Sequence, residues 1–243
     1  MKKVILFLSI ISVTLLMTSC LGDSETYYSG APLSYITKTE LGTIYARPID
    51  GPPMTSPQIR NEDLMNRFVY IAYSWKEGVN DITNENIYNA TVTQISDPID
   101  QVYNLVGGAA PELETELPLK SFEVDLYGGP YFDYHWICGY SYGKGDGHKK
   151  TLQGYYTFEE GKENEVIVDL RLVEAPTGGT IDKDQTSLPV AINFKAINDH
   201  YATGLSSGST KTVQVYFRYW REKSDGTLEL NKTNSYSLLI IKE

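Results

Sequence analysis

The chain has 243 residues, and its 21 basic and 31 acidic residues give it a formal net charge of −10 at pH 7. Binding to nucleic acid or to anionic lipid headgroups depends on clustered Lys and Arg, so this composition argues against both partners. The 19 tyrosines and three tryptophans favour β-strands. The length allows one large β-domain or two smaller ones without a disulfide or a metal to hold them together.

Residues 1–19 have the pattern of a signal peptide. Two lysines precede an apolar run from position 4 to 16, which is shorter than the about 20 residues that a membrane-spanning helix needs. The small residues Thr18 and Ser19 follow, as cleavage by a signal peptidase requires. Cleavage there removes two basic residues and no acidic one, which leaves a formal charge of −12.

Cys20 comes directly after these small residues, and this order resembles the lipobox of bacterial lipoproteins. The resemblance implies that the leader is cut and that the Cys20 thiol is acylated. We expect this lipid to anchor the protein in the outer membrane, either exposed at the cell surface or facing the periplasm. Met17 departs from the pattern, because a lipobox usually has Leu three residues before the Cys. An ordinary secretory signal with an incidental Cys is the alternative. Cys138 then has no partner in the chain and is expected to be a small buried side chain.

Residues 20–34 are predicted to form a polar tether behind the lipidated Cys. Asp23 and Glu25 resemble the acidic export signal of surface-exposed lipoproteins in Bacteroidota-type bacteria. A solvated linker is the alternative interpretation of the same residues.

Residues 35–105 are expected to form a small N-terminal β-domain. The stretch RFVYIAYSW (67–75) has the composition of a strand with bulky side chains on both faces. The Pro-rich stretch 48–58 cannot lie in a central strand, and a short helix is expected near 60–67.

Residues 106–118 are rich in Gly, Pro and Glu, and we interpret them as a linker to a C-terminal domain over 119–243. A single continuous sandwich is the alternative. Apolar and polar residues alternate beyond this point with a period of two, which is typical of strands with one buried face. Asp-Gly pairs at 146–147 and 225–226 are strong hairpin signals. Strands are expected at 121–128, 131–143, 164–174, 212–220 and 235–242, with a short helix at 196–201.

This layout resembles the NigD-like lipoproteins. The stretches that carry the likeness are LMNRFVYIAYSW, NIYNATVTQISDPI, the aromatic run YFDYHWICGYSYG, and the final KTVQVYFRYW and SYSLLIIK. The resemblance implies an all-β fold, in which an N-terminal small OB-like barrel is followed by a C-terminal antiparallel β-sandwich. It also implies an association with bacteriocins, and hence an immunity or accessory role, and it supplies no catalytic residues.

No motif in the sequence predicts catalysis, a cofactor or a metal site. GYSYG (139–143) and GLSSG (204–208) match the serine-hydrolase pattern, but neither precedes a helix, as the nucleophile turn of these enzymes requires. The three histidines lack a second His or a Cys at metal-ligand spacing. We therefore expect a protein that is not an enzyme.

Aromatic residues are the one suggestive feature. Tyr216 and Trp220 alternate with the apolar residues of their strand and should point outward, and Trp136 lies on an aromatic-dense face. These three rings could stack on sugar rings, or they could simply pack the core. The sequence thus favours a non-catalytic envelope lipoprotein that binds an unknown envelope protein, and a glycan-binding lipoprotein of a polysaccharide-uptake system is the alternative.

Overall fold

The computed structural model describes residues 26–126 and 132–242, so the expected signal peptide and Cys20 lie outside the described residues. Strands make up nearly all of the regular structure, which confirms the all-β class. The chain divides into two compact units, Met1–Pro98 and Ile99–Glu243. A helix long and apolar enough to cross a membrane is absent from residues 26–126 and 132–242.

The first unit is a small barrel. Strand β5 pairs with β1 and β2 on one side and with β7 on the other, and β2 continues the sheet through β3 and β4. Strand β4 pairs in parallel with β6, which leads directly into β7, so the ring closes on β5. This order, with a short helix before β5, is that of an OB-like barrel, as expected. Its elements are β1 (Tyr27–Gly30), β2 (Leu33–Lys38), β3 (Ile44–Pro48), β4 (Met54–Thr55), η1 (Glu62–Leu64), β5 (Phe68–Lys76), β6 (Tyr88–Asn89) and β7 (Thr91–Ile95).

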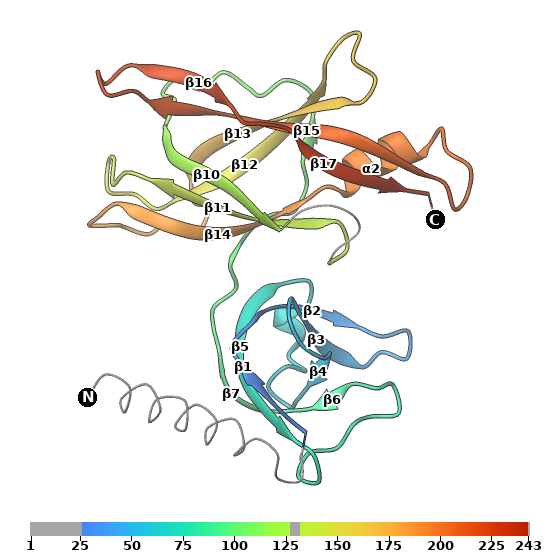
Figure 1. Cartoon of the computed structure of the whole chain (residues 1–243). Helices are drawn as coiled ribbons and strands as arrows, with labels where there is room; N and C mark the ends of the chain where they lie inside the picture. The colour runs from blue at the N-terminus through green and yellow to red at the C-terminus, as the bar shows by residue number, and fades with distance from the viewer. Residues whose placement is uncertain (1–25, 127–131, 243) are drawn as a thin grey trace, which may run out of the picture. The chain divides into compact units, whose positions relative to one another are not determined.

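The second unit has two layers of strands packed face to face (Figure 1). One layer has the order β8, β14, β11, β10, and the other has the order β9, β12, β13, β15, with β16 and β17 on the outer edge of β15. The elements are β8 (Asp100–Val102), β9 (Val106–Gly107), β10 (Leu119–Leu126), β11 (His135–Tyr142), β12 (Lys150–Phe158), β13 (Glu165–Glu174), β14 (Gln185–Asn193), α2 (Lys195–Ala202), β15 (Thr210–Glu222), β16 (Leu228–Lys232) and β17 (Tyr236–Ile241).

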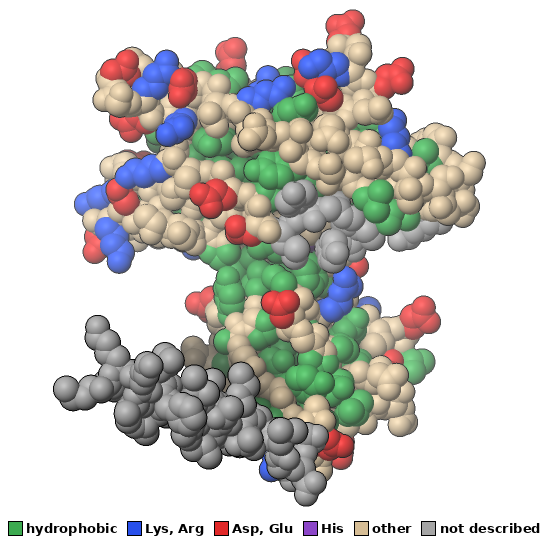
Figure 2. Space-filling view, in the orientation of Figure 1, with side chains coloured by type: hydrophobic (Ala, Val, Ile, Leu, Met, Phe, Trp, Pro, Cys, Tyr) green, Lys and Arg blue, Asp and Glu red, His purple; other side chains and the backbone are tan. Residues whose placement is uncertain are grey.

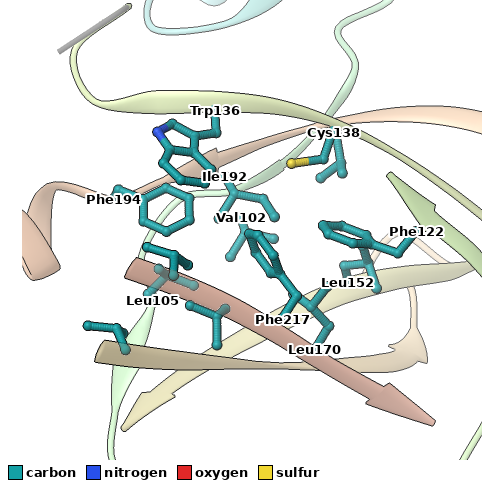
Figure 3. Packing of buried hydrophobic residues seen from close by; sticks show 14 of the residues in the cluster. Val102, Leu105, Phe122, Trp136, Cys138, Leu152, Leu170, Ile192, Phe194 and Phe217 are labelled. Atoms are coloured by element: carbon teal, nitrogen blue, oxygen red, sulfur yellow. The ribbon is translucent and has the colours of Figure 1, made fainter. Parts of the chain in front are cut away.

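The alternation in β13 and β15 predicted their buried faces correctly. Val213, Val215 and Phe217 are fully buried, and so are Val166 and Val168 of the neighbouring strand. Figure 3 shows Phe217 among the rings and aliphatic side chains of both layers. This core positions the strand ends, where the candidate site lies.

The sandwich is mixed, which corrects the expectation of a purely antiparallel one. Strand β13 pairs with β15 in parallel, from Glu165–Gln214 to Leu170–Tyr219. Parallel neighbours need a long connection, and here β14 and α2 supply it between the two strands. Periodicity shows which face of a strand is buried, but it carries no information about the direction of its neighbour.

The division between the units lies at Pro98, earlier than the 106–118 linker expected from composition. Strand β8 pairs with β14, and β9 pairs with β12, so the segment from 100 to 107 belongs to the second unit. Leu105 is buried and crosses β12 at Gly154, where an added Cβ would come within 2.4 Å of Leu105 Cδ2. The Gly and Pro residues that follow therefore run over one unit and do not separate two.

Strand β11 begins at His135, later than expected, because a turn precedes it. Phe132, Asp133 and Tyr134 all have left-handed backbone conformations, with φ values of 46°, 55° and 68°, which no strand can contain. The His135 Nδ1–H donates to the carbonyl oxygen of Phe132 at 2.6 Å, and burial lowers the pKa of this imidazole. His135 is therefore a buried ring at the start of β11, and Asp133 lies exposed in the turn before it.

Candidate functional site

A pocket of about 390 Å³ opens at the corner of the second unit, where Leu119 of β10 meets Arg221 of β15. Residues 117–120 and 221–224 form two sides of it, and the end of β11 with the following turn forms a third. Lys150 at the start of β12 and Leu172 near the end of β13 complete the wall. We call this site the corner pocket, and four parts of the sequence converge on it: residues 117–120, 142–150, 172 and 221–224.

Charged side chains crowd this end of the unit. In Figure 2, Lys and Arg side chains lie beside Asp and Glu side chains at the left end of the second unit, where Figure 1 places the turns between its strands. The described lining of the corner pocket holds four cations, Lys120, Lys150, Arg221 and Lys223, and the single carboxylate of Glu222. This cationic wall contrasts with the net charge of −10 of the whole chain.

Lys150 is the buried cation of the corner pocket, with 4% of its surface exposed. Its ammonium group donates to Asp146 Oδ2 at 2.9 Å, and the Asp146 side chain is itself half exposed. An ammonium group has three N–H donors. Within residues 26–126 and 132–242, two of those on Lys150 have no protein acceptor. Burying a charge in this way is costly unless an anion or other acceptors satisfy it.

The other three cations differ in how they are paired. Lys120 forms an ion pair with Asp184, and Lys223 lies 3.5 Å from Glu229. Arg221 forms no ion pair with any residue that the structure describes, although its guanidinium offers five N–H donors. Arg221 is thus the cation of the pocket without a carboxylate partner, and Lys150 is the buried cation with two N–H donors that lack a protein acceptor.

The rest of the wall is apolar. Leu119 and Leu172 are almost fully buried, and Leu117 is half-buried beside them. Tyr142 is 2% exposed, and its hydroxyl oxygen accepts the backbone N–H of Lys150 at 3.1 Å. This bond holds the start of β12 against the end of β11, and both residues are part of the pocket lining.

The β11–β12 turn brings Asp146 to Lys150. Gly145 and Gly147 have φ values of 55° and 84°, a left-handed conformation that glycine adopts without strain. Asp146 Oδ1 accepts the backbone N–H of His148 at 3.0 Å, which fixes the carboxylate within the turn. The Asp-Gly pair that predicted a hairpin therefore also supplies the counter-ion of the pocket.

Hydrogen bonds keep the two partner acids ionised. The ammonium of Lys150 and the backbone N–H of His148 lower the pKa of Asp146 below its ordinary value. The ammonium of Lys120 and the backbone N–H of Lys144 lower the pKa of Asp184 in the same way. At neutral pH both carboxylates offset part of the positive charge in the wall.

Two other cavities are less suited to an anion. A cavity of about 310 Å³ in the first unit is lined by Arg47 and Glu85, and hydroxyl groups of Thr43 and Thr39 lower the pKa of that carboxyl. A cavity of about 270 Å³ beside α2 is lined by Lys195 and Asp199, which pair with each other at 2.9 Å. Neither is lined by a buried cation.

Trp136 is not available for ligand stacking, which corrects that expectation. Its side chain is fully buried and stacks on Phe194 with ring centroids 4.3 Å apart (Figure 3). The aromatic-dense face of β11 is the inner face of the sandwich, so the density reflects core packing.

Tyr216 and Trp220 lie on the face of β15 opposite the core, and both are half-buried. The Lys232 ammonium lies 4.1 Å from the centre of the Tyr216 ring, so one face of this ring is covered. The Trp220 indole N–H is buried without an acceptor among the described residues. Stacking of a sugar on either ring stays a prediction, and neither ring lines the corner pocket.

The serine motifs do not form nucleophile turns. Ser141 lies within β11, is buried, and has its Oγ 2.6 Å from Ser121 Oγ. Ser206 follows α2 and precedes β15, so it leaves a helix where the hydrolase motif enters one. In the part of the chain that the structure describes, no group of three His, Cys, Asp or Glu side chains could hold a metal ion.

The sequence reasoning missed the corner pocket, although a local signal was present. Lys150 falls at a buried position of β12, on the same face as Leu152 and Gly154. A lysine at an apolar position of an alternating pattern is unusual, because Lys is almost never fully buried unless it is paired. The Asp-Gly hairpin signal accounts for the approach of the β11 end, whereas the approach of residues 117–120, 172 and 221–224 depends on strand pairing and has no signal in the sequence.

No protein-family model matches the chain, and no curated protein matches its sequence. Among solved structures, an uncharacterized protein of Parabacteroides merdae is 13% identical with a TM-score of 0.56, over 88% of this chain and 99% of that one. A candidate lipoprotein of Bacteroides fragilis is 13% identical with a TM-score of 0.51, over 88% and 98%. A NigD-like immunity protein of Bacteroides caccae is 12% identical with a TM-score of 0.48, over 89% and 98%.

These similarities concern the fold. Because a TM-score of 0.48 is too low to establish a shared fold, the assignment depends on the proteins of P. merdae and B. fragilis. The chain thus shares its fold with an uncharacterized protein and with a candidate lipoprotein. None of the three is described by a catalytic activity.

Proposed function

We propose that the chain is a non-catalytic, lipid-anchored protein of the cell envelope whose second unit binds an anionic ligand in the corner pocket. The observation that carries the binding role is Lys150, a buried residue of the pocket lining whose ammonium has two N–H donors that no described protein group accepts. Arg221 adds a guanidinium without an ion pair to the same wall. An apolar residue at position 150 would give the fold equal or greater stability, so stability alone does not explain a lysine there.

The anchor in this proposal is Cys20. The apolar run before it is too short to span a bilayer, and Cys20 follows the small Thr18 and Ser19 where an acyl group would be attached. Two or three acyl chains hold a protein durably, whereas one holds it only marginally. The outer membrane, and an accessory or immunity role there, are the parts of the proposal that depend on the family resemblance.

Acyl labelling of cells that produce the chain tests the anchor. The Cys20→Ala chain should lose the label, and it should either leave the membrane fraction or remain unprocessed. Cys138→Ala is the matched control, since Cys138 is fully buried in the core and should change neither the label nor the fractionation. A Cys20→Ala chain that still carries a labelled acyl group would overturn the anchor.

Titration calorimetry of the full chain in detergent tests the binding role, with a panel of small anions that includes inorganic phosphate, glucuronate and N-acetyl-leucine. At least one anion should bind saturably and more weakly in high salt, because salt screens exposed charge. Lys150→Met should weaken that binding. Absence of saturable binding by every anion would contradict the role.

The glycan alternative in its aromatic form has less support. Trp136 is buried, and Lys232 covers one face of the Tyr216 ring. Affinity electrophoresis on a panel of polysaccharides tests what remains of it. Retardation on a glycan that is abolished by Trp220→Ala would restore the aromatic surface as the binding site.

A further inference from the structure

The chemistry of the corner pocket narrows the class of anion, and this step depends on the proposed binding function. We infer that the corner pocket takes an apolar amino-acid carboxylate, either a free amino acid or the C-terminal residue of a peptide. The unused donors of Lys150 and Arg221 bind the carboxylate, the apolar wall takes the side chain, and Glu222 accepts from the N–H group of the ligand.

The charge of the pocket suits one carboxylate better than a highly charged ligand. Lys120, Lys150 and Lys223 have carboxylate partners in Asp184, Asp146 and Glu229. The ammonium of Lys150 has two N–H donors without a protein acceptor, and Arg221 has no carboxylate partner among the described residues. A planar guanidinium with several N–H groups matches the two oxygens of a carboxylate, and the buried ammonium reaches the same group from inside the wall.

The apolar wall argues against a sugar acid. Each sugar hydroxyl brings a donor that must find an acceptor once it is removed from water. In the lining that the structure describes, the side-chain oxygens available as acceptors are those of Glu222, Ser224 and Tyr142. The Tyr142 oxygen already accepts the backbone N–H of Lys150. Leu117, Leu119 and Leu172 offer an aliphatic surface instead.

Glu222 adds an acidic residue to the pocket, so a ligand should carry an N–H donor as well as a carboxylate. Glu222 is part of the pocket lining, and its carboxylate forms no ion pair with a described residue. A simple anion would be repelled by it, whereas an amino acid or a peptide end places an N–H donor next to its own carboxylate. A volume of about 390 Å³ is within the range of small-ligand sites and holds one residue with its flanking groups.

Calorimetry and saturation-transfer NMR on the full chain in detergent test this inference with four probes. N-acetyl-leucine carries all three features, N-acetyl-leucinamide lacks the carboxylate, and glucuronate and inorganic phosphate lack the apolar body. We expect N-acetyl-leucine to bind and the other three to bind at least ~10-fold more weakly, because one charge-assisted contact is worth about that factor.

Three variants locate the site. Lys150→Met and Arg221→Gln should each weaken N-acetyl-leucine binding ~10-fold or more. Lys162→Met is the matched control, since it removes the same charge from the turn at the opposite end of the β12–β13 hairpin. Equal weakening by all three variants would overturn the site, because it would show an effect of overall charge.

The outcomes separate the inference from the proposed function. Binding of phosphate or glucuronate in place of N-acetyl-leucine, with loss in Lys150→Met, would overturn the amino-acid class and leave an anion-binding function. Absence of binding by all probes would overturn both. Free leucine and a pentapeptide ending in Leu then distinguish a free amino acid from a peptide C-terminus as the ligand. Similar affinities for leucine and N-acetyl-leucine indicate a free amino acid. Tighter binding of the peptide indicates a chain terminus.

Discussion

The two ends of the β12–β13 hairpin hold lysines in opposite circumstances. At the turn between the strands, Lys162 lies 3.1 Å from Glu159 and 3.1 Å from Glu165, and its side chain is 46% exposed. Lys150 lies at the other end of β12, a strand that spans roughly 27 Å at about 3.4 Å per residue. It is 4% exposed, and its ammonium has one acceptor. The better solvated lysine thus has more protein partners than the buried one.

We interpret Lys162 as a lysine whose charge is satisfied by the folded protein, and Lys150 as a lysine whose charge is satisfied in part by a ligand. Exposed ion pairs such as those of Lys162 cost little to form and contribute little. A buried ammonium with free donors costs stability, and proteins retain such groups where binding or catalysis needs them. Removing charges of each kind should therefore affect stability and binding differently.

The largest effect is expected for the ion pair in which Arg218 satisfies both carboxylate oxygens of the buried Asp169. Arg218 Nε and Nη2 donate to the two oxygens of Asp169 at 2.8 and 2.7 Å, and Asp169 is 2% exposed. Arg218→Met leaves this carboxylate buried without a partner, which should lower the free energy of unfolding by about 3 kcal/mol. Denaturant unfolding monitored by tryptophan fluorescence measures the loss.

The double variant provides the control for this pair. Arg218→Met with Asp169→Leu removes both charges, so it should be clearly more stable than Arg218→Met alone. A double variant that is less stable than the single one would show that the pair contributes more than it costs to bury.

Lys150→Met should have a different effect. Its partner Asp146 is 52% exposed and returns to water, so the free energy of unfolding should change by less than about 1 kcal/mol in either direction. Saturating N-acetyl-leucine should raise the melting temperature of the unmodified chain and not that of Lys150→Met, since a ligand stabilises only the state that it binds. A loss of stability as large as that of Arg218→Met would indicate a structural role for Lys150.

Lys162→Met should change neither property to a measurable extent. The lysine is exposed, its two acids keep 35% and 25% of their side-chain surface in contact with water, and Glu159 also has Lys232 nearby. Its melting temperature and its stabilisation by N-acetyl-leucine should match those of the unmodified chain. Lost ligand stabilisation in Lys162→Met would contradict the distinction between the two ends of the hairpin.

The smallest effect concerns the titration of Asp146. The pKa of this carboxyl is lowered in the folded chain, first by Lys150 and then by the backbone N–H of His148. The resulting stability is therefore present above the unfolded pKa of about 3.9 and is lost as the pH falls through the folded pKa. Carbon-detected NMR of the carboxyl group should show the pKa rising in Lys150→Met, and no change in that variant would mean that the ion pair is absent in solution.

Local patterns predicted the strands well and the site poorly. Alternation placed Val213, Val215 and Phe217 in the core, because the period of a strand depends on its own residues alone. The same alternation suggested a strand from 131, where three left-handed residues ending at Tyr134 interrupt the backbone but not the aromatic pattern. The parallel pairing of β13 with β15 and the corner at Leu119 and Arg221 depend on contacts distant in the sequence.

Spectra of the lysine ammonium groups during titration with N-acetyl-leucine test the central claim most directly. In ¹H–¹⁵N correlation spectra that detect side-chain Nζ atoms, the Lys150 signal should shift with the ligand and reach saturation, because its two free N–H donors gain an acceptor. The Lys162 signal should stay in place. A Lys150 signal that does not move while the ligand binds elsewhere, or equal shifts of both signals, would contradict the assignment of the corner pocket as the binding site.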